Sequence, residues 1–221
     1  GSGRPSSRSS SPVPAADPAP PAAAYPDGGG GAFPAASPDG EAAVDWKHFW
    51  RVVEAAYRAD GPDHFEALKA ELAALPWFAV VAFQARFDEA IAAANRLDLW
   101  GAAYLIQGGC SDDAFRDFRC WLVGRGRHPY EAALRNPDSL ADILDGDPVD
   151  GFGLDAAAVR VYESQTGMSD FYAQLDRAEK DAPPPPPEGD DWDFEDAAEQ
   201  RRRFPRLAAL YLTPREEDSE T

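Results

Sequence analysis

The sequence predicts an all-α fold: a single compact multi-helix domain between a disordered N-terminal tail and a Pro-rich, acidic C-terminal extension. Three observations lead to this prediction. Large apolar residues recur every three to four positions in several windows, which is the spacing of one helix face. These windows are separated by Gly, Pro, Asp and Asn, the residues that begin and end helices. No window shows the alternation of β-branched residues that is typical of strands.

Composition divides the chain into three parts. Residues 1–44 are rich in Pro, Ala, Gly and Ser and have too few large apolar side chains to offset the entropy of folding, so we expect a disordered tail or linker. Residues 45–180 hold the amphipathic windows and are assigned to the helical domain. Residues 181–221 open on the run Pro183–Pro187, which favours an extended spacer, with an SH3-type ligand as the alternative.

The apolar spacing predicts seven to nine short helices in the domain. Their approximate bounds, in chain order, are 45–59, 63–75, 77–96, 98–107, 112–123, 129–135, 139–144, 154–166 and 170–175.

Two further helical pieces are expected in the extension, one carrying Arg201–Arg203 and one after Pro205 with Leu207, Leu210 and Tyr211 on its inner face. Leaving Trp192, Phe194, Phe204 and Leu210 in water would cost roughly 1.5–3 kcal/mol per side chain. We therefore expect this part to dock, either on the helical body or on a partner.

The densest group of signals lies in the corner 98–121. Asp98 can cap a helix on which Trp100 and Tyr104 share one face. Gly108 and Gly109 end that helix, because glycine enters the left-handed conformation without a side-chain clash. Ser111 then caps the next helix, with Asp112 and Asp113 in its first turn, where negative charge complements the exposed amides.

This corner also carries a family resemblance. The segments Asp98–Tyr104, Gly108–Asp113 and Phe115–Leu122 resemble a bacterial family catalogued as domain of unknown function 4240. Further matches lie at Trp46–Trp50, Asn136–Leu140, Asp191–Phe194 and Arg206–Tyr211, so that the resemblance covers roughly residues 44–212. It implies a mainly helical fold and a domain boundary, and it brings no reaction, ligand or catalytic residue.

Aromatic, amide and guanidinium groups near a helix N-terminus could receive an anionic or heterocyclic ligand, or a partner. The candidate residues for this corner are Trp100, Tyr104, Gln107, Cys110, Ser111, Asp112, Asp113, Arg116, Arg119 and Trp121. The alternative is ordinary core aromatics beside solvated arginines. Cys110 precedes a helix start, which can activate a thiol, but the neighbouring carboxylates oppose this, so we expect a structural cysteine. We likewise interpret Asp112 and Asp113 as helix-capping residues rather than metal ligands.

Composition limits the remaining functions. The net charge of −18 opposes binding to nucleic acid. No apolar run reaches the roughly 20 residues that cross a membrane. His48, His64 and His128 lack a ligand spacing, so neither metal nor cofactor is expected. Two cysteines suit free thiols in the cytoplasm.

The sequence therefore favours a cytoplasmic, non-enzymatic protein-interaction or regulatory module with a protein partner. The alternative is an enzyme or small-molecule-binding protein with a pocket at the corner 98–121. Neither the partner nor the oligomeric state follows from the residues.

Overall fold

A computed structural model of the chain describes residues 44–58, 63–144, 146, 149–151, 153–175 and 185–212. The predicted N-terminal tail, apart from Val44, lies outside these residues, as do Pro183 and Pro184. The all-α prediction is confirmed: the described residues form helices and no named strand, and the β-type pairing recorded among them is an isolated bridge between Arg96 and Glu188. The elements are α1 (Trp46–Arg58), α2 (His64–Ala73), α3 (Trp77–Ala93), α4 (Leu97–Gln107), α5 (Asp112–Gly124), α6 (Arg127–Arg135), the 3₁₀ segments η1 (Pro137–Asp142) and η2 (Leu154–Ala156), α7 (Ala157–Thr166), α8 (Phe171–Gln174), α9 (Ala197–Arg203) and α10 (Pro205–Tyr211).

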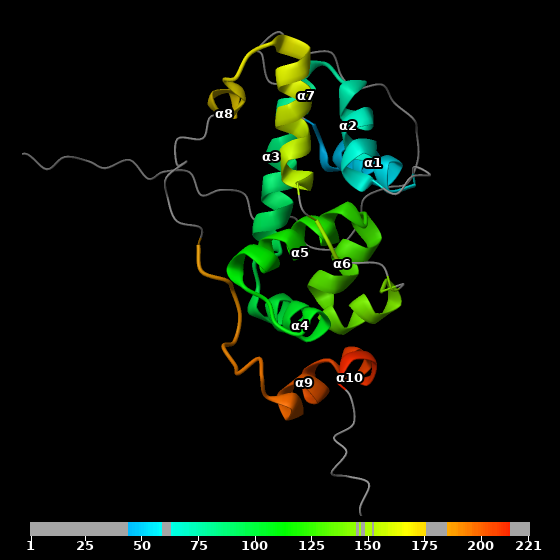
Figure 1. Ribbon diagram of the computed structural model, residues 1–221, viewed down its shortest axis with the longest axis vertical. Coiled ribbons are helices and arrows are strands. Elements are labelled where there is room, and N and C mark those ends of the chain that lie inside the picture. Colours follow the sequence, from blue (N-terminus) through cyan, green and yellow to red (C-terminus); the bar gives the residue numbers. More distant parts are fainter. Residues whose placement is uncertain are drawn as a thin grey trace, which may run out of the picture.

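The first three helices and α7 form one end of the molecule. There α2 packs on α1, and α7 lies along both α2 and α3 (Figure 1). Apolar residues of α1 and α3 meet in an aromatic cluster, in which the ring of Phe49 lies 5.0 Å from that of Phe83 and 6.4 Å from that of Phe87. All three rings are buried. The apolar residues that recur every three to four positions in the sequence thus lie on the buried faces of these helices.

Helix α5 connects this end to the rest, since it packs on α1, α3, α4 and α6. The backbone at Gly151 crosses α5 so closely that a Cβ there would lie 2.2 Å from both the Asp117 carbonyl oxygen and the Trp121 amide nitrogen. Glycine is required at this crossing because the obstructing atoms are backbone and cannot rotate away.

Several predicted boundaries shift by a turn or less. Helix α3 ends at Ala93 rather than near Arg96, and α6 begins at Arg127 rather than at Pro129, which becomes its third residue. The helix expected from Leu154 opens with the 3₁₀ turn η2. At the end of α3 the reason is tertiary, because the Asn95 carbonyl accepts a hydrogen bond from the amide of Glu188 instead of continuing the helix.

Helix α8 begins at Phe171, and its N-cap residue, Asp170, makes no side-chain cap bond. Its carboxylate instead accepts hydrogen bonds from the hydroxyl of Tyr162 in α7 at 2.8 Å and from the side-chain amide of Gln174 in α8 itself at 2.8 Å.

The C-terminal segment, which we define as residues 185–212, lies at the end of the molecule opposite α8, with its helices α9 and α10 against α4 and η1 (Figure 1). The expected inner face of α10 is partly wrong. Leu207 and Ala208 are buried, whereas Leu210 is 61% exposed. A helix of seven residues can turn only a narrow stripe toward its neighbour, and Leu210 falls outside it.

Within the part of the chain that the structure describes, no helix has both the length and the apolar composition that crossing a membrane requires.

Candidate functional site

The corner between α4 and α5 is built as its glycines and serine predict. Gly108 closes α4 in the left-handed conformation, with φ of 68°, and the amide of Gly109 donates to the Tyr104 carbonyl at 2.9 Å. Ser111 caps α5 by accepting a hydrogen bond from the amide of Ala114 at 3.3 Å. The sequence was sufficient to predict the end of α4 and the start of α5, because each of these residues acts on the backbone within a few positions of itself.

The predicted cap of α4 is wrong. Helix α4 begins at Leu97, with Arg96 at the N-cap and Asp98 already in the first turn. Asp98 instead forms an ion pair with Arg96, whose guanidinium lies 2.7 Å from the carboxylate. The early start has a tertiary cause: the amide of Leu97 donates to the carbonyl of Glu188 at 2.8 Å, in the C-terminal segment.

Trp100 contacts both the second helix of the corner and the turn that leads to it. Its indole stacks on Phe115 of α5, with ring centroids 4.9 Å apart and planes 6° apart. Its indole N–H donates to the carbonyl of Cys110 at 3.0 Å. The side chain therefore holds α4, the glycine turn and α5 together, so its role within the chain is structural.

The remaining predicted corner residues do not converge on one point. Arg116 forms an ion pair with Asp155 of η2 at 2.6 Å, and Arg119 donates to the carbonyl of Ile91 in α3 at 3.2 Å. Trp121 is buried in the core. Gln107, Asp112 and Asp113 are exposed. The structure thus distributes these side chains around α5 and its neighbours, where the arginines contact η2 and α3.

The two thiols are weak nucleophiles. Burial raises the pKa of the Cys110 thiol to about 11, and the charge of Asp112 acts in the same direction. Burial also raises the pKa of Cys120 to about 12. Both side chains are therefore protonated near neutral pH, whereas the thiolate is the reactive form.

The C-terminal segment covers α4, and Trp192 is its central contact. The Trp192 ring lies over Gly101, where an added Cβ would be 2.3 Å from Cζ2 of the indole. Phe204 and the guanidinium of Arg203 flank the indole, at 5.9 and 4.8 Å. Gly101 thus serves as the seat of a tryptophan, because any side chain at this position of α4 would occupy the space of the ring.

Phe194 and Glu195 of the segment cover the exposed side of the corner. The Phe194 ring lies 6.1 Å from that of Trp100 and 5.9 Å from that of Tyr104. The hydroxyl of Tyr104 donates to the carboxylate of Glu195 at 3.0 Å, and this hydrogen bond raises the pKa of Tyr104. The face of α4 that the sequence assigned to a ligand or partner is therefore occupied by residues about 90 positions later in the chain.

Backbone pairing fixes the start of the segment. The amide of Glu188 donates to the Asn95 carbonyl at 2.9 Å, in addition to the bond that the Glu188 carbonyl accepts from Leu97. The side-chain amide of Asn95 donates to the Pro185 carbonyl at 2.8 Å. These hydrogen bonds align the segment with the residues that lead into α4.

Asp138 of η1 binds the other end of the C-terminal segment, at the start of α10. Its carboxylate accepts hydrogen bonds from the backbone amides of Arg206 and Leu207, at 3.0 Å each, and so caps α10 from another element. Pro205, the first residue of α10, has no amide hydrogen to satisfy. Asp138 is only 5% exposed, so these two amides take the place of water as hydrogen-bond donors to its carboxylate. We call Asn95–Leu97, Trp100, Gly101, Tyr104 and Asp138 the docking surface.

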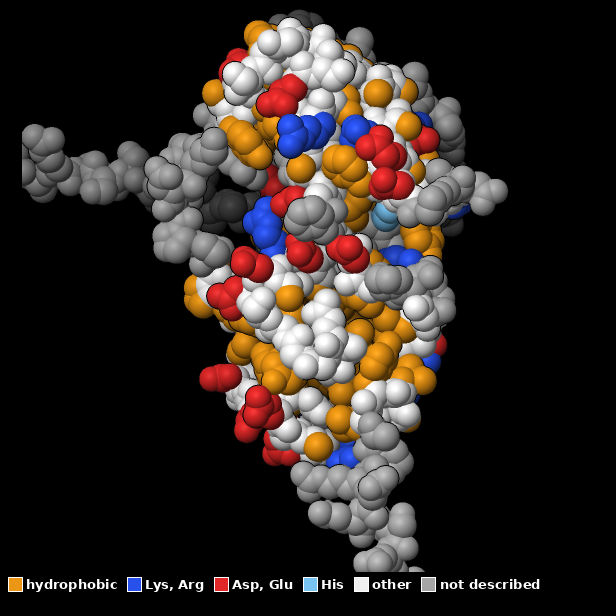
Figure 2. All heavy atoms as spheres, in the orientation of Figure 1, with side chains coloured by type: hydrophobic (Ala, Val, Ile, Leu, Met, Phe, Trp, Pro, Cys, Tyr) orange, Lys and Arg blue, Asp and Glu red, His pale blue; other side chains and the backbone are white. Residues whose placement is uncertain are grey.

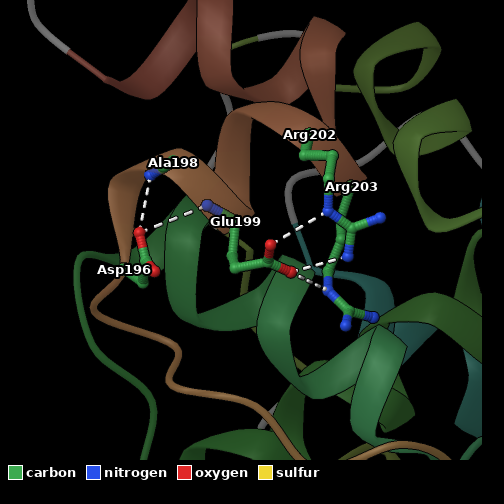
Figure 3. Close-up of polar contacts among 5 residues, drawn as sticks. All are labelled: Asp196, Ala198, Glu199, Arg202 and Arg203. Carbon is green, nitrogen blue, oxygen red and sulfur yellow. Dashed lines mark hydrogen bonds and ion pairs between the residues drawn. The ribbon is translucent and has the colours of Figure 1, made fainter.

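The segment also organises itself. Asp196 caps α9 by accepting from the amides of Ala198 and Glu199, and Glu199 forms ion pairs with Arg202 and Arg203 at 2.6 and 3.0 Å (Figure 3). The two guanidinium groups lower the pKa of Glu199 to about 2. Two arginines of the run, Arg202 and Arg203, thus share one carboxylate within the segment.

The outer side of the docked segment is acidic. Trp192 and Phe194 turn inward, whereas the carboxylates between them and around them are exposed, and acidic side chains line this edge of the molecule in Figure 2. The acidic residues of this stretch are Glu188, Asp190, Asp191, Asp193, Glu195 and Asp196.

Sequence reasoning expected the segment to dock but missed its contacts. It assigned no role to Gly101 or Asp138. One signal was present: Gly101 is a glycine inside an otherwise well-formed helix, next to Trp100 and three residues before Tyr104, and such a glycine indicates a position of close packing. Among the described residues, no group of three or more His, Cys, Asp and Glu side chains is arranged to hold a metal ion.

Together these features define a class of protein: a helical domain whose aromatic corner is covered by its own C-terminal segment. The chain belongs to the family described as "Protein of unknown function (DUF4240)", whose model matches residues 44–174. The match includes the docking surface and ends before the C-terminal segment, so the resemblance seen in the sequence at 191–194 and 206–211 lies outside it. No curated protein and no solved structure matches the chain.

Proposed function

We propose that this protein is a non-enzymatic protein-interaction or regulatory module, and that the docking surface is its binding site. The ligand is a short protein segment that presents a tryptophan and, two residues later, a phenylalanine, followed by a helix. The observation that carries the proposal is the seat at Gly101, where α4 lacks a side chain at the position that Trp192 fills.

The recognition chemistry is that of a peptide-binding site. Extended backbone pairs with Asn95 and Leu97, an aromatic anchor enters a seat on a helix, and a buried carboxylate caps the helix that follows. Main-chain hydrogen bonds supply affinity in such sites, and anchor side chains supply specificity. In this chain, the segment 185–212 acts as the ligand.

Two features favour binding over catalysis at the corner. The thiol of Cys110 is protonated because burial raises its pKa, and the guanidinium groups of Arg116 and Arg119 already bind a carboxylate and backbone carbonyls. Groups so engaged hold helices together. We also propose a cytoplasmic location, since unpaired thiols such as Cys110 and Cys120 suit a reducing compartment.

The proposal is tested by cutting the full-length chain once it has folded. A specific protease site replaces residues in the connection 176–184, which precedes the C-terminal segment in the sequence, and the purified chain is then cleaved. We expect the two pieces to remain together on size-exclusion chromatography at tens of micromolar and to separate on dilution, with a dissociation constant measurable by calorimetry.

The matched control carries Trp192→Ala in the same cleavable chain. It removes the anchor and leaves the backbone pairing, so its pieces should separate at concentrations at which the parent pieces stay together. Separation of the parent pieces at every concentration, or equal retention of the control, would rule out the docking surface as a binding site.

A further inference from the structure

We infer that the exposed rings of Pro185 and Pro186 form a second interaction surface, which binds a protein domain whose groove is lined by aromatic side chains and bordered by basic ones. These prolines open the C-terminal segment and lie before the part of it that packs on Gly101. The inference is independent of the proposed function, because it concerns rings that the helical body leaves uncovered.

Steric restriction sets the conformation of this stretch. The sequence has five consecutive prolines, Pro183–Pro187, and each proline holds its own φ at about −65° and excludes the residue before it from the helical region. The described part of the run, residues 185–187, accordingly belongs to no helix or strand. Such a run favours the polyproline II helix, a preformed conformation that loses little entropy when it binds.

The helical body holds the stretch by its backbone. The side-chain amide of Asn95 donates to the carbonyl of Pro185 at 2.8 Å. Three residues later, the amide and the carbonyl of Glu188 pair with Asn95 and Leu97, at 2.9 and 2.8 Å. The proline rings take no part in these hydrogen bonds. The body therefore fixes the position of the stretch, and a ligand fixed in its bound conformation pays less entropy on binding.

The rings face in different directions. A polyproline II helix has three residues per turn, so successive rings point about 120° apart. Pro187 is half-buried, whereas Pro185 and Pro186 are exposed. One face of the stretch thus lies toward the body and two neighbouring faces remain open, at the start of the orange trace in Figure 1. A spacer only has to cover distance, whereas an aromatic-lined groove binds adjacent proline rings, which this arrangement presents.

The residues after the rings determine the charge of the partner. Glu188, Asp190 and Asp191 follow directly, and all three are exposed. Opposite charges at the edge of an interface speed association, and like charges suppress wrong partners. A groove with Lys or Arg beside its aromatic residues therefore fits this surface, and a groove with an acidic border is repelled.

The test titrates the full-length chain into isotope-labelled SH3 and WW domains, chosen in pairs with basic and with acidic groove borders. Binding is followed by NMR chemical shifts of the domains. We expect the basic-bordered domains to bind, with shifts confined to groove residues, and the acidic-bordered domains to bind about tenfold more weakly or less. Added salt should reduce this difference, because it screens the exposed carboxylates.

The disabling variant is Pro185→Ala with Pro186→Ala. It removes both exposed rings and keeps the backbone carbonyl that Asn95 binds, so its melting temperature should stay near that of the parent chain while affinity falls about tenfold or more. The matched control is Pro187→Ala, which alters the half-buried ring and should retain affinity within about threefold.

Two results would overturn the inference. If no basic-bordered domain binds the parent chain, the prolines act only as a spacer. If the variant without the two exposed rings binds as tightly as the parent chain, another part of the protein is being recognised. Equal binding of basic-bordered and acidic-bordered domains would contradict the charge that we assign to the partner.

Discussion

The contact between Gly101 and Trp192 predicts that Gly101→Ala lowers the free energy of unfolding when Trp192 is present and raises it when Trp192 is absent. Gly101→Ala places a methyl group 2.3 Å from Cζ2 of Trp192, where carbon atoms in ordinary contact are about 3.5–4.0 Å apart. The indole has to move by about 1 Å or more, and its contacts with Phe194 and Phe204 move with it. We expect overpacking to cost about 1–3 kcal/mol.

The same substitution has a favourable side. Gly101 lies inside α4, and replacing a helical glycine by alanine stabilises a helix by roughly 0.5–1 kcal/mol when space allows. In the intact chain the clash dominates, and Gly101→Ala should lower the free energy of unfolding by about 1–2 kcal/mol. In a Trp192→Ala background the ring is gone, and Gly101→Ala should raise it by roughly 0.5–1 kcal/mol.

The assay is a double-mutant cycle in urea followed by circular dichroism, with trypsin cleavage at Arg201–Arg203 as a readout of segment release. Cleavage should be faster in Gly101→Ala than in the parent chain. If Gly101→Ala changes the free energy of unfolding by the same amount and in the same direction in both backgrounds, the Trp192 ring does not contact Gly101, because residues in contact are expected to show coupling.

Three further predictions follow from single contacts. Asp138→Ala should lower the free energy of unfolding in urea by about 0.5–2 kcal/mol, because it removes the side-chain cap of α10. The control is Asp142→Ala, which removes an exposed ion pair with Arg206. It should change stability little and leave the amides of α10 protected from hydrogen exchange. Gly151→Ala should cost about 1–3 kcal/mol, since its methyl group meets α5 backbone; an unchanged melting temperature would contradict the close crossing. Burial of His64 and the charge of Arg125 lower the pKa of His64 below its ordinary value of 6.5, so as pH falls below about 6.5 the unfolded state takes up the proton first and stability declines. His64→Gln should flatten the unfolding free energy between pH 7 and pH 5, a range above the titration of ordinary carboxylates, and an unaltered slope there would exclude this histidine as the cause.

Local chemistry in the sequence determined the fold class and the corner. Apolar spacing defined the helix faces, and Gly108 and Ser111 set the end of α4 and the start of α5, because each acts on backbone within one turn of itself. Tertiary structure decided the rest of the site. Asp98 lost its predicted role because Glu188 pairs with Leu97, and Asp138 gained one because Arg206 and Leu207 reach it.

The role of Gly101 shows why sequence could not go further. Within α4 it is a weak helix former, and its neighbours along the helix do not indicate which side chain packs against it. Its use becomes visible only when Trp192, about 90 residues later, lies on it. Spacing along the chain encodes which face of a helix is apolar, but it carries no information about which distant ring that face receives; that is decided by how the whole chain packs.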